Sequence, residues 1–193
     1  MQISRLMKII TLILFFTSQA VYADTIQEPV SDLDAHVHGL SELTLAIEGN
    51  MLEIQLKSPA MNLLGFEHKA HSKDDIASVE NVLLQLSEAE LLFSFSDGHC
   101  ALTDSDIDVS SVLDSDDTHG HEAEHHDHEN EDNHSDIIAH YHYNCESVAN
   151  LSSITVALFD VFPGIEKIQA QWITEKQQGG QTLSTEKRII SLR

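Results

Sequence analysis

Apolar and polar residues alternate along ELTLAIEGNMLEIQLK, residues 42–57, on both sides of Gly49 and Asn50. An alternation with a period of two is typical of a β-strand that buries one face, and a glycine-containing pair suits a tight turn. We therefore predict a β-hairpin over this segment. The residues predicted to share its buried face are Leu43, Leu45, Ile47, Ile54 and Leu56.

The spacing of apolar residues becomes helical after residue 71. Before that point, Pro59 and Gly65 interrupt any regular element in SPAMNLLGFEH. In SKDDIASVENVLLQL, Ser72 is a suitable N-cap, and Asp74 and Asp75 suit a first turn, where helices favour negative charge. The apolar residues at helical spacing are Ile76, Val79, Val82, Leu83 and Leu86. The segment is predicted to form one helix of about three and a half turns.

The second half of the chain is predicted to be rich in strands, which are LLFSFS, HCALTDSDIDVSS, IIAHYHYNC, SITVALF, KIQAQWIT and TLSTEKRIISL. Gly179 and Gly180 are predicted to form the turn between the last two, and residues 162–164 (Phe-Pro-Gly) form a sharp connection. A hairpin, a helix and then a run of strands favour an α+β class over a βαβ alternation. We expect a single domain with a mainly antiparallel sheet and one principal helix.

The N-terminus, MQISRLMKIITLILFFTSQAVYA, has the features of a secretory signal peptide. Arg5 and Lys8 form a basic region, an apolar run covers residues 9–16, and small residues precede a cleavage point after Ala23. A membrane anchor is the alternative, but this run is about half the roughly 20 residues that a spanning helix needs. We expect export, cleavage of residues 1–23, no membrane span afterwards, and one domain over residues 24–193.

The exported chain would be strongly acidic. Removing residues 1–23 takes away two of the 10 basic residues and none of the 32 acidic ones, so the formal net charge changes from −22 to −24. Such a chain repels nucleic acid and anionic lipid, and it attracts cations. We therefore expect no nucleic-acid partner and look for groups that bind cations.

Cys100 and Cys145 are the two cysteines of the chain. In an exported protein such a pair is most simply one disulfide, and two free thiols acting as metal ligands are the alternative. A disulfide closing residues 100–145 would stabilise the fold by about 4 kcal/mol in the chain-entropy model. It would also hold the histidine-rich segment between the two cysteines close to the flanking strands.

Two histidine pairs occur inside segments that otherwise have the pattern of strands. DAHVHGL contains His36 and His38, and IAHYHYNC contains His140 and His142. In a strand, residues i and i+2 project from one face about 7 Å apart, so both imidazoles of a pair can bind one zinc ion. If the two strands are neighbours, four nitrogens could form one tetrahedral site. The alternative is that each pair is simply polar surface.

A further candidate group follows the hairpin, where Glu67 and His68 are adjacent and His71 comes three residues later. Any of the three could supply a ligand, and Glu67 could instead accept a hydrogen bond that fixes the tautomer of an imidazole. A surface role without metal is an equally simple interpretation for His71.

Residues 114–136 have Ala123 as their one apolar residue, and we expect them to form a long disordered loop inserted between strands. Its six histidines are His119, His121, His125, His126, His128 and His134. Imidazoles among carboxylates suit zinc, with nickel and copper as competitors. A tract tethered beside the strands would supply these ligands at roughly millimolar effective concentration. A solvated acidic linker without metal is the alternative.

The same tract contains HEAEH, which matches the H-E-x-x-H signature of zinc metalloproteases. That chemistry needs an ordered helix that buries its other face, so that two histidines hold the metal and the glutamate activates water. The flanking residues offer nothing to bury, and crowded acids repel one another along a helix. We therefore interpret the match as part of a chelating tract.

The segment AHVHGLSELTLAIEGNMLEIQLKSPAMNLLGFEH resembles the zinc-regulated, zinc-binding periplasmic proteins of Gram-negative bacteria, the ZrgA family. The likeness extends to the acidic His-rich insert, HYHYNC and FPGIEKIQ, and so covers most of the exported chain. It implies a periplasmic zinc binder that is made under zinc limitation and assists import alongside an ATP-driven zinc importer. By analogy, the residues to test are His36, His38, Glu67, His68, His140 and His142.

Three functions are compatible with these features. The first is a non-catalytic periplasmic protein that captures scarce Zn²⁺, more than one ion per chain, and passes it on. The second is a small metal-dependent hydrolase or oxidoreductase, which would keep an open coordination position. The third is a buffer against excess zinc or copper. Copper favours soft ligands, and the exported chain has only Met51 and Met61 besides its two cysteines.

Overall fold

The computed structural model describes residues 37–113 and 135–192. The predicted signal peptide, and the predicted His-rich loop apart from its last two residues, lie outside the described residues. The strands are β1 (Leu40–Glu48), β2 (Met51–Pro59), β3 (Phe93–Phe95), β4 (Cys100–Asp108), β5 (Asp136–Cys145), β6 (Ser153–Val156), β7 (Lys167–Ile173), β8 (Gln178–Ser184) and β9 (Ile189–Ser191). The helices are α1 (Ala60–Leu64), α2 (Lys73–Ser87), α3 (Ala89–Leu92), α4 (Leu158–Val161) and the 3-10 helix η2 (Val148–Asn150).

These strands form two sheets. The larger has the order β4-β5-β2-β1-β7-β8, and the smaller has the order β3-β6-β9. Neighbouring strands are antiparallel except for β1 and β7, which are parallel. The predicted α+β class, with a mainly antiparallel sheet and α2 as its principal helix, is confirmed for the described residues.

The predicted hairpin is confirmed by β1 and β2. Leu45 lies opposite Ile54, and both side chains are buried, as the alternation requires. Gly49 has φ +57° in the turn, a conformation that glycine adopts without the steric cost a side chain would bring. All five residues predicted for the buried face are in the core.

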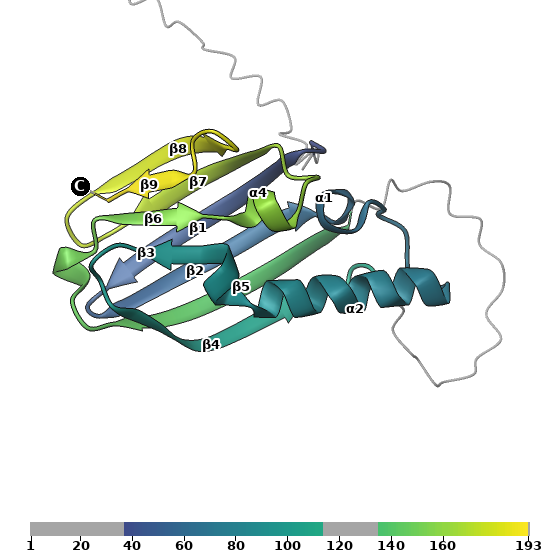
Figure 1. The fold of residues 1–193 in the computed structure, drawn as a ribbon, viewed down its shortest axis with the longest axis horizontal. Coiled ribbons are helices and arrows are strands. Elements are labelled where there is room, and N and C mark those ends of the chain that lie inside the picture. Colours follow the sequence, from purple (N-terminus) through teal and green to yellow (C-terminus); the bar gives the residue numbers. More distant parts are fainter. Residues whose placement is uncertain (1–36, 114–134, 193) are drawn as a thin grey trace, which may run out of the picture. The chain divides into compact units, whose positions relative to one another are not determined.

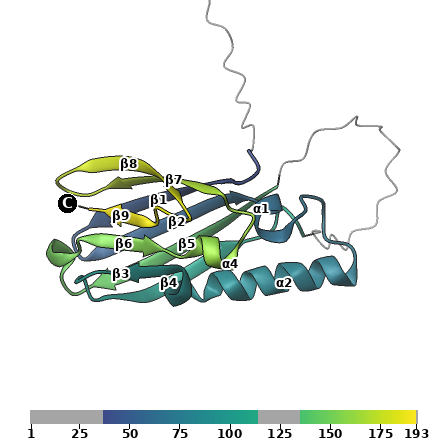
Figure 2. The same ribbon diagram turned by 45° about the horizontal axis from the view of Figure 1, so that its top comes forward.

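The core lies on one face of the large sheet, where β3, β6, β9 and α2 cover it (Figures 1 and 2). Tyr141 of β5 is fully buried there, and its hydroxyl donates a 2.9 Å hydrogen bond to the carbonyl oxygen of Leu86 in α2. Burial raises the pKa of Tyr141, so the phenol stays neutral and keeps its proton for this bond. The opposite face of the large sheet carries polar side chains, which include exposed Glu42 and Glu53.

Helix α2 begins as predicted. The Ser72 side chain accepts a hydrogen bond from the Asp75 backbone N–H, and the Asp75 carboxylate accepts one from the Ser72 N–H, which forms a capping box. Val79, Val82 and Leu86 are buried. Ile76, which was predicted for the same face, is 41% exposed because the first turn extends beyond the sheet that the helix covers (Figure 1).

Three local predictions need correction. The segment TLSTEKRIISL, which was predicted as one strand, is divided by a turn at residues 184–187 into the end of β8 in the large sheet and β9 in the small sheet. The SPAMNLLGFEH segment contains the short helix α1, and Gly65 closes that helix in the left-handed conformation, with φ +81°. Gly179 and Gly180 lie inside β8, while the turn falls at residues 174–177. A Cβ on Gly179 would lie 2.2 Å from the ring of Trp172, so this glycine makes room for an indole and does not form the turn.

The predicted disulfide is present between Cys100 and Cys145. It joins the first residue of edge strand β4 to the last residue of β5, which are direct partners in the sheet. The two cysteines are therefore not available as thiolate ligands. Among the described residues, no helix is long and apolar enough to cross a membrane.

Candidate metal-binding site

His38 lies in a turn that leads into β1. Gly39, with φ +84°, makes this turn, and its N–H donates a 2.7 Å hydrogen bond to the Asn62 side chain of α1. The Asn62 amide donates in turn to the carbonyl oxygen of Leu40 at 2.9 Å. Asn62 is 4% exposed, so these bonds are made in a nearly dry environment and hold the start of β1 against α1.

The Asn62 contact places His38 beside the chain that follows α1. His38 Nε2 lies 3.1 Å from Glu67 Oε1, across a sequence separation of 29. The His38 side chain is 54% exposed and that of Glu67 is 18% exposed. An imidazole and a carboxylate thus meet at an accessible surface. Either both can bind a metal ion, or the carboxylate can fix the tautomer of a metal-binding imidazole.

The segment that carries Glu67 also holds both ends of the histidine-rich tract. Before the tract, Lys69 Nζ donates a 2.8 Å hydrogen bond to the carbonyl oxygen of Leu113. The N–H of Ala70 donates a 2.8 Å hydrogen bond to the carbonyl oxygen of Val112. After the tract, the Ser135 hydroxyl lies 3.0 Å from the carbonyl oxygen of Glu67. The described chain thus ends at residue 113 and resumes at residue 135 beside the segment that carries Glu67, the partner of His38.

His68 faces a different neighbour. Its Nε2 lies 3.6 Å from Asp75 Oδ2, and its ring stacks on that of Phe66 with centroids 4.6 Å apart. Hydrogen bonding with Ser72, first from its side chain, lowers the pKa of Asp75 and keeps this carboxylate charged. His71 lies in the same connection between α1 and α2. The predicted group at residues 67–71 therefore lies in the segment that contacts residues 112, 113 and 135. We call this segment, together with His38, the base of the tract.

His140 and His142 lie on the uncovered face of the large sheet. They alternate with buried Ala139, Tyr141 and Tyr143, so the pair shares one face as predicted. Strand β2 lies between β5 and β1, and His38 precedes β1 and is not inside a strand. A single site with all four imidazoles would need the two histidine segments to lie on neighbouring strands, and they do not.

The structure leaves several predicted ligands undescribed, namely His36, His119, His121, His125, His126, His128 and His134. Among the described residues, no three His, Cys, Asp or Glu side chains stand together in a form that could hold a metal ion. The HEAEH match at residues 121–125 also lies outside the described residues.

Sequence reasoning missed several residues around these histidines. Asn62 and Ser135 gave no signal, because their partners are backbone groups far away in the sequence. In the sheet, His142 lies between Asp104 of β4 and Glu53 of β2, and Asp106 of β4 lies opposite His140. The alternation in TDSDID is a signal that could have placed its aspartates on one face, but the histidines facing them depend on strand pairing.

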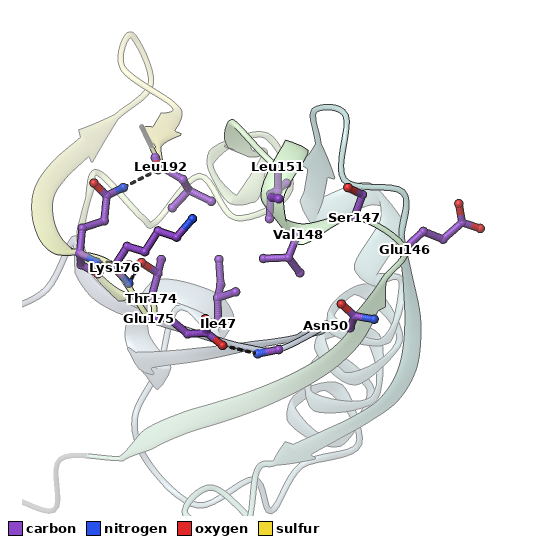
Figure 3. A pocket seen from close by; sticks show the side chains of 13 residues that line it. Ile47, Asn50, Glu146, Ser147, Val148, Leu151, Thr174, Glu175, Lys176 and Leu192 are labelled. Atoms are coloured by element: carbon purple, nitrogen blue, oxygen red, sulfur yellow. Dashed lines mark hydrogen bonds between the residues drawn. The ribbon is translucent and has the colours of Figure 1, made fainter.

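A cavity of about 560 Å³ lies at the other end of the β1–β2 hairpin, around Gly49. Ile47, Leu151 and Leu192 give it an apolar lining, and Lys176 stands at its side (Figure 3). None of the residues described as lining this cavity is a histidine or cysteine. It is therefore separate from the candidate metal ligands.

Comparison with known proteins gives one assignment. The model of a family described as ZrgA family zinc uptake protein matches residues 35–192. This range includes all of the described residues and the histidine-rich tract. No curated protein matches the chain.

Proposed function

Because the chain belongs to the ZrgA family of zinc uptake proteins, we propose that it is a non-catalytic periplasmic protein that captures Zn²⁺ under zinc limitation. It passes the ion on to support import by an ATP-driven zinc importer. Zinc is the cargo of this protein, and more than one ion is bound per chain. Export through the N-terminal signal peptide places the protein in the periplasm.

The observation that carries this proposal is the position of the His38–Glu67 pair beside the two ends of the histidine-rich tract. The tract has six histidines among carboxylates, and the carboxylates attract divalent cations that the imidazoles can bind. The chain on both sides of the tract is fixed beside Glu67, so the tract is tethered to the fold there, and tethering raises the effective concentration of its ligands.

His38 and Glu67, beside the ends of the tract, supply the more ordered ligands. We propose that the tight site uses His38 and Glu67 with His36 and His68, which together supply four ligands. Zinc prefers four ligands of this nitrogen and oxygen type in a closed site. The Asp75 carboxylate, 3.6 Å from His68 Nε2, is placed to orient this ring, as carboxylates commonly do behind zinc-binding histidines.

The accessible position of the pair supports transport over catalysis. His38 is more than half exposed on an open surface, and neither the cavity at Gly49 nor one of about 610 Å³ at Trp172 has a histidine among its described lining residues. A metal-dependent hydrolase usually places its ion in a concave pocket that binds the substrate. An open surface instead suits the exchange of an ion with another protein.

The proposal is tested by calorimetric titration of the exported chain, residues 24–193, with Zn²⁺. A second protein has residues 115–133 replaced by a short Gly-Ser linker, which can join the ends because Ser135 and Ser111 already lie within a 3.1 Å hydrogen bond. We expect this replacement to lower the number of bound ions and to leave a tight site. In the full chain, replacing His36 and His38 together by alanine should abolish that tight site.

Absence of Zn²⁺ binding by the full chain would refute the proposal. Loss of all binding after the linker replacement would refute an ordered site at the base of the tract. Unchanged affinity after replacement of His36 and His38 would show that this pair is not involved. The import role has its own test: expression should rise under zinc starvation, whereas induction by excess zinc would indicate a protective buffer.

A further inference from the structure

We infer that the uncovered face of the large sheet carries a second, separate Zn²⁺ site, formed by His140 and His142 of β5 with Asp104 and Asp106 of β4. The inference rests on the proposed function only in taking Zn²⁺ as the ion. Its ligands differ from those at the base of the tract. Strands β4, β5 and β2 lie side by side at one edge of the sheet (Figure 1).

A β-bulge puts the aspartates on this face. From Cys100 to Leu102, β4 pairs with β5 in a regular register, with Leu102 opposite Tyr143. The next pair is Asp104 with His142, so Thr103 is the extra residue. Without this bulge, Asp104 would lie opposite Tyr141 and would point into the core. The Thr103 hydroxyl donates to the carbonyl oxygen of His142 at 2.9 Å and fastens the bulge.

The bulge therefore creates two cross-strand pairs of one type. Asp104 lies opposite His142, and Asp106 lies opposite His140. Direct partners on one face of an antiparallel pair have Cβ atoms about 4.5–5.5 Å apart, and the two histidines of the pair are about 7 Å apart. Two imidazoles and two carboxylates thus occupy the four corners of a small patch.

A third carboxylate borders the patch from the other side. Glu53 of β2 lies opposite His142, and its Oε1 is 3.6 Å from His142 Nδ1. The nearest cation on β2, Lys57, lies opposite Ile138 and forms a 3.3 Å ion pair with Asp136. The patch is therefore locally acidic, which favours a divalent cation.

The ligand types select the metal. Imidazole nitrogen with carboxylate oxygen suits Zn²⁺, whereas Mg²⁺ and Ca²⁺ prefer oxygen alone. As these side chains stand, they do not form a group of three that could hold a metal ion, and His142 faces Glu53. Binding therefore requires side-chain rotations, which the exposed aspartates and half-buried histidines allow. These rotations cost entropy, so this site is expected to bind more weakly than the base of the tract and to exchange its ion readily.

An acidic edge strand has another explanation, because charges on an edge discourage pairing with strands of other molecules. Asp108 separates the two explanations. It lies on the same face of the same strand and has the same charge, but its partner across the sheet is Ile138 and not a histidine. Its carboxylate accepts from the Ser110 N–H at 2.8 Å, a bond that asparagine can also accept.

The test uses the full exported chain with ¹⁵N-labelled histidine, titrated with Zn²⁺ and followed by NMR. The signals of His140 and His142 are assigned from the His140→Ala and His142→Ala variants. We expect both imidazoles to shift on Zn²⁺ addition, after the signals of the tighter site. Asp104→Asn and Asp106→Asn should each weaken the binding read at these two histidines by about 10-fold or more. Asp108→Asn should change it by less than about 2-fold, since it removes only a screened charge.

Two outcomes would overturn the inference. One is that His140 and His142 do not respond to Zn²⁺ while other histidines of the same sample do, which leaves the proposed function standing. The other is that Asp108→Asn weakens binding as much as Asp104→Asn, which would mean general electrostatic attraction. Absence of any histidine response would instead refute the proposed function together with this site.

Discussion

His38 and Glu67 meet through their side chains at 3.1 Å, yet neither lies in a regular element of the large sheet. Their separation is set by a buried contact one residue further along, where Asn62 accepts from the Gly39 N–H. The pair is therefore held by α1, and α1 is continuous with the segment that fastens the ends of the histidine-rich tract. A change in any of these contacts is expected to alter zinc binding.

Glu67→Gln tests the carboxylate of this pair. The amide keeps the size of the side chain and removes its charge, so Zn²⁺ affinity at the tight site should fall about 10- to 100-fold, whether Glu67 binds the ion or positions His38. Calorimetric titration of the exported chain measures this. Glu42→Gln is the matched control, since Glu42 is an exposed carboxylate on β1. Equal losses in both variants would exclude a specific role for Glu67.

Asn62→Ala tests the contact that positions His38. The substitution leaves the Gly39 N–H and the hydroxyls of Ser41 and Ser58 without their buried amide partner, so the free energy of unfolding should fall by about 1–3 kcal/mol. Urea unfolding measures the loss. Asn144→Ala, at an exposed position of β5, should cost less than about 0.5 kcal/mol. A variant of Asn62 as stable as the parent would show that this network is not needed.

Reduction of the disulfide is expected to affect stability and not zinc binding. Opening the link between Cys100 and Cys145 frees the chain between them, so the melting temperature should drop, in line with a loss of about 2–4 kcal/mol. The number of Zn²⁺ ions bound should not change, because the cysteines are not ligands. The control is the double variant Cys100→Ser, Cys145→Ser, whose melting temperature should not respond to a phosphine reductant. Stoichiometry that rises on reduction would reinstate the thiols as ligands.

Acid should weaken the start of α2 through Asp75. Hydrogen bonding with Ser72 lowers the pKa of Asp75 from its ordinary value of 3.8, so the folded state favours the charged carboxylate. The stability that the charged carboxylate contributes is complete when the pH is above the ordinary pKa. It is lost as the pH falls through the lowered pKa of the folded state. Asp75→Asn should therefore be less stable than the parent at neutral pH, and the difference should shrink toward pH 3. Thermal unfolding across this range measures it, and a difference independent of pH would contradict the assignment.

Zinc binding should also weaken in acid, for a separate reason. Only neutral imidazole binds the ion, and free imidazole titrates near pH 6.5, so apparent affinity should fall below about pH 6. Titrations at several pH values, with the fold checked by circular dichroism at each, separate this effect from unfolding. Affinity that is constant from pH 7 to 5 would indicate carboxylate ligands alone.

Much of the local structure follows from short stretches of sequence. The alternation around Gly49 predicts both strands of the hairpin and the buried face of each, because a period of two sets which side chains share a face. Ser72 and Asp75 predict the start of α2, because the capping box is made within four residues. Where two local interpretations compete, the pattern can fail, as it does for Gly179, which accommodates Trp172 inside a strand.

The candidate ligands could be named from the sequence, but their grouping could not. The pattern of IAHYHYNC predicts that His140 and His142 share a face, and they do. It carries no information on whether β1, β2 or β4 lies beside β5. Insertion of β2 between β1 and β5 separates the two histidine segments, and the bulge at Thr103 brings Asp104 opposite His142.

The sequence by itself determined most of the strands, the principal helix, most of the faces that they bury, the choice of cysteine partners and the residue types suited to zinc. Each of these depends on spacing along the chain or on composition, and both are local properties. Only the tertiary structure decided that Glu67 meets His38, that segment 65–71 holds both ends of the tract, and that aspartates of β4 face the histidines of β5. These contacts depend on strand order, register and one bulge, which arise from the packing of the whole core and leave no periodic signal in the chain.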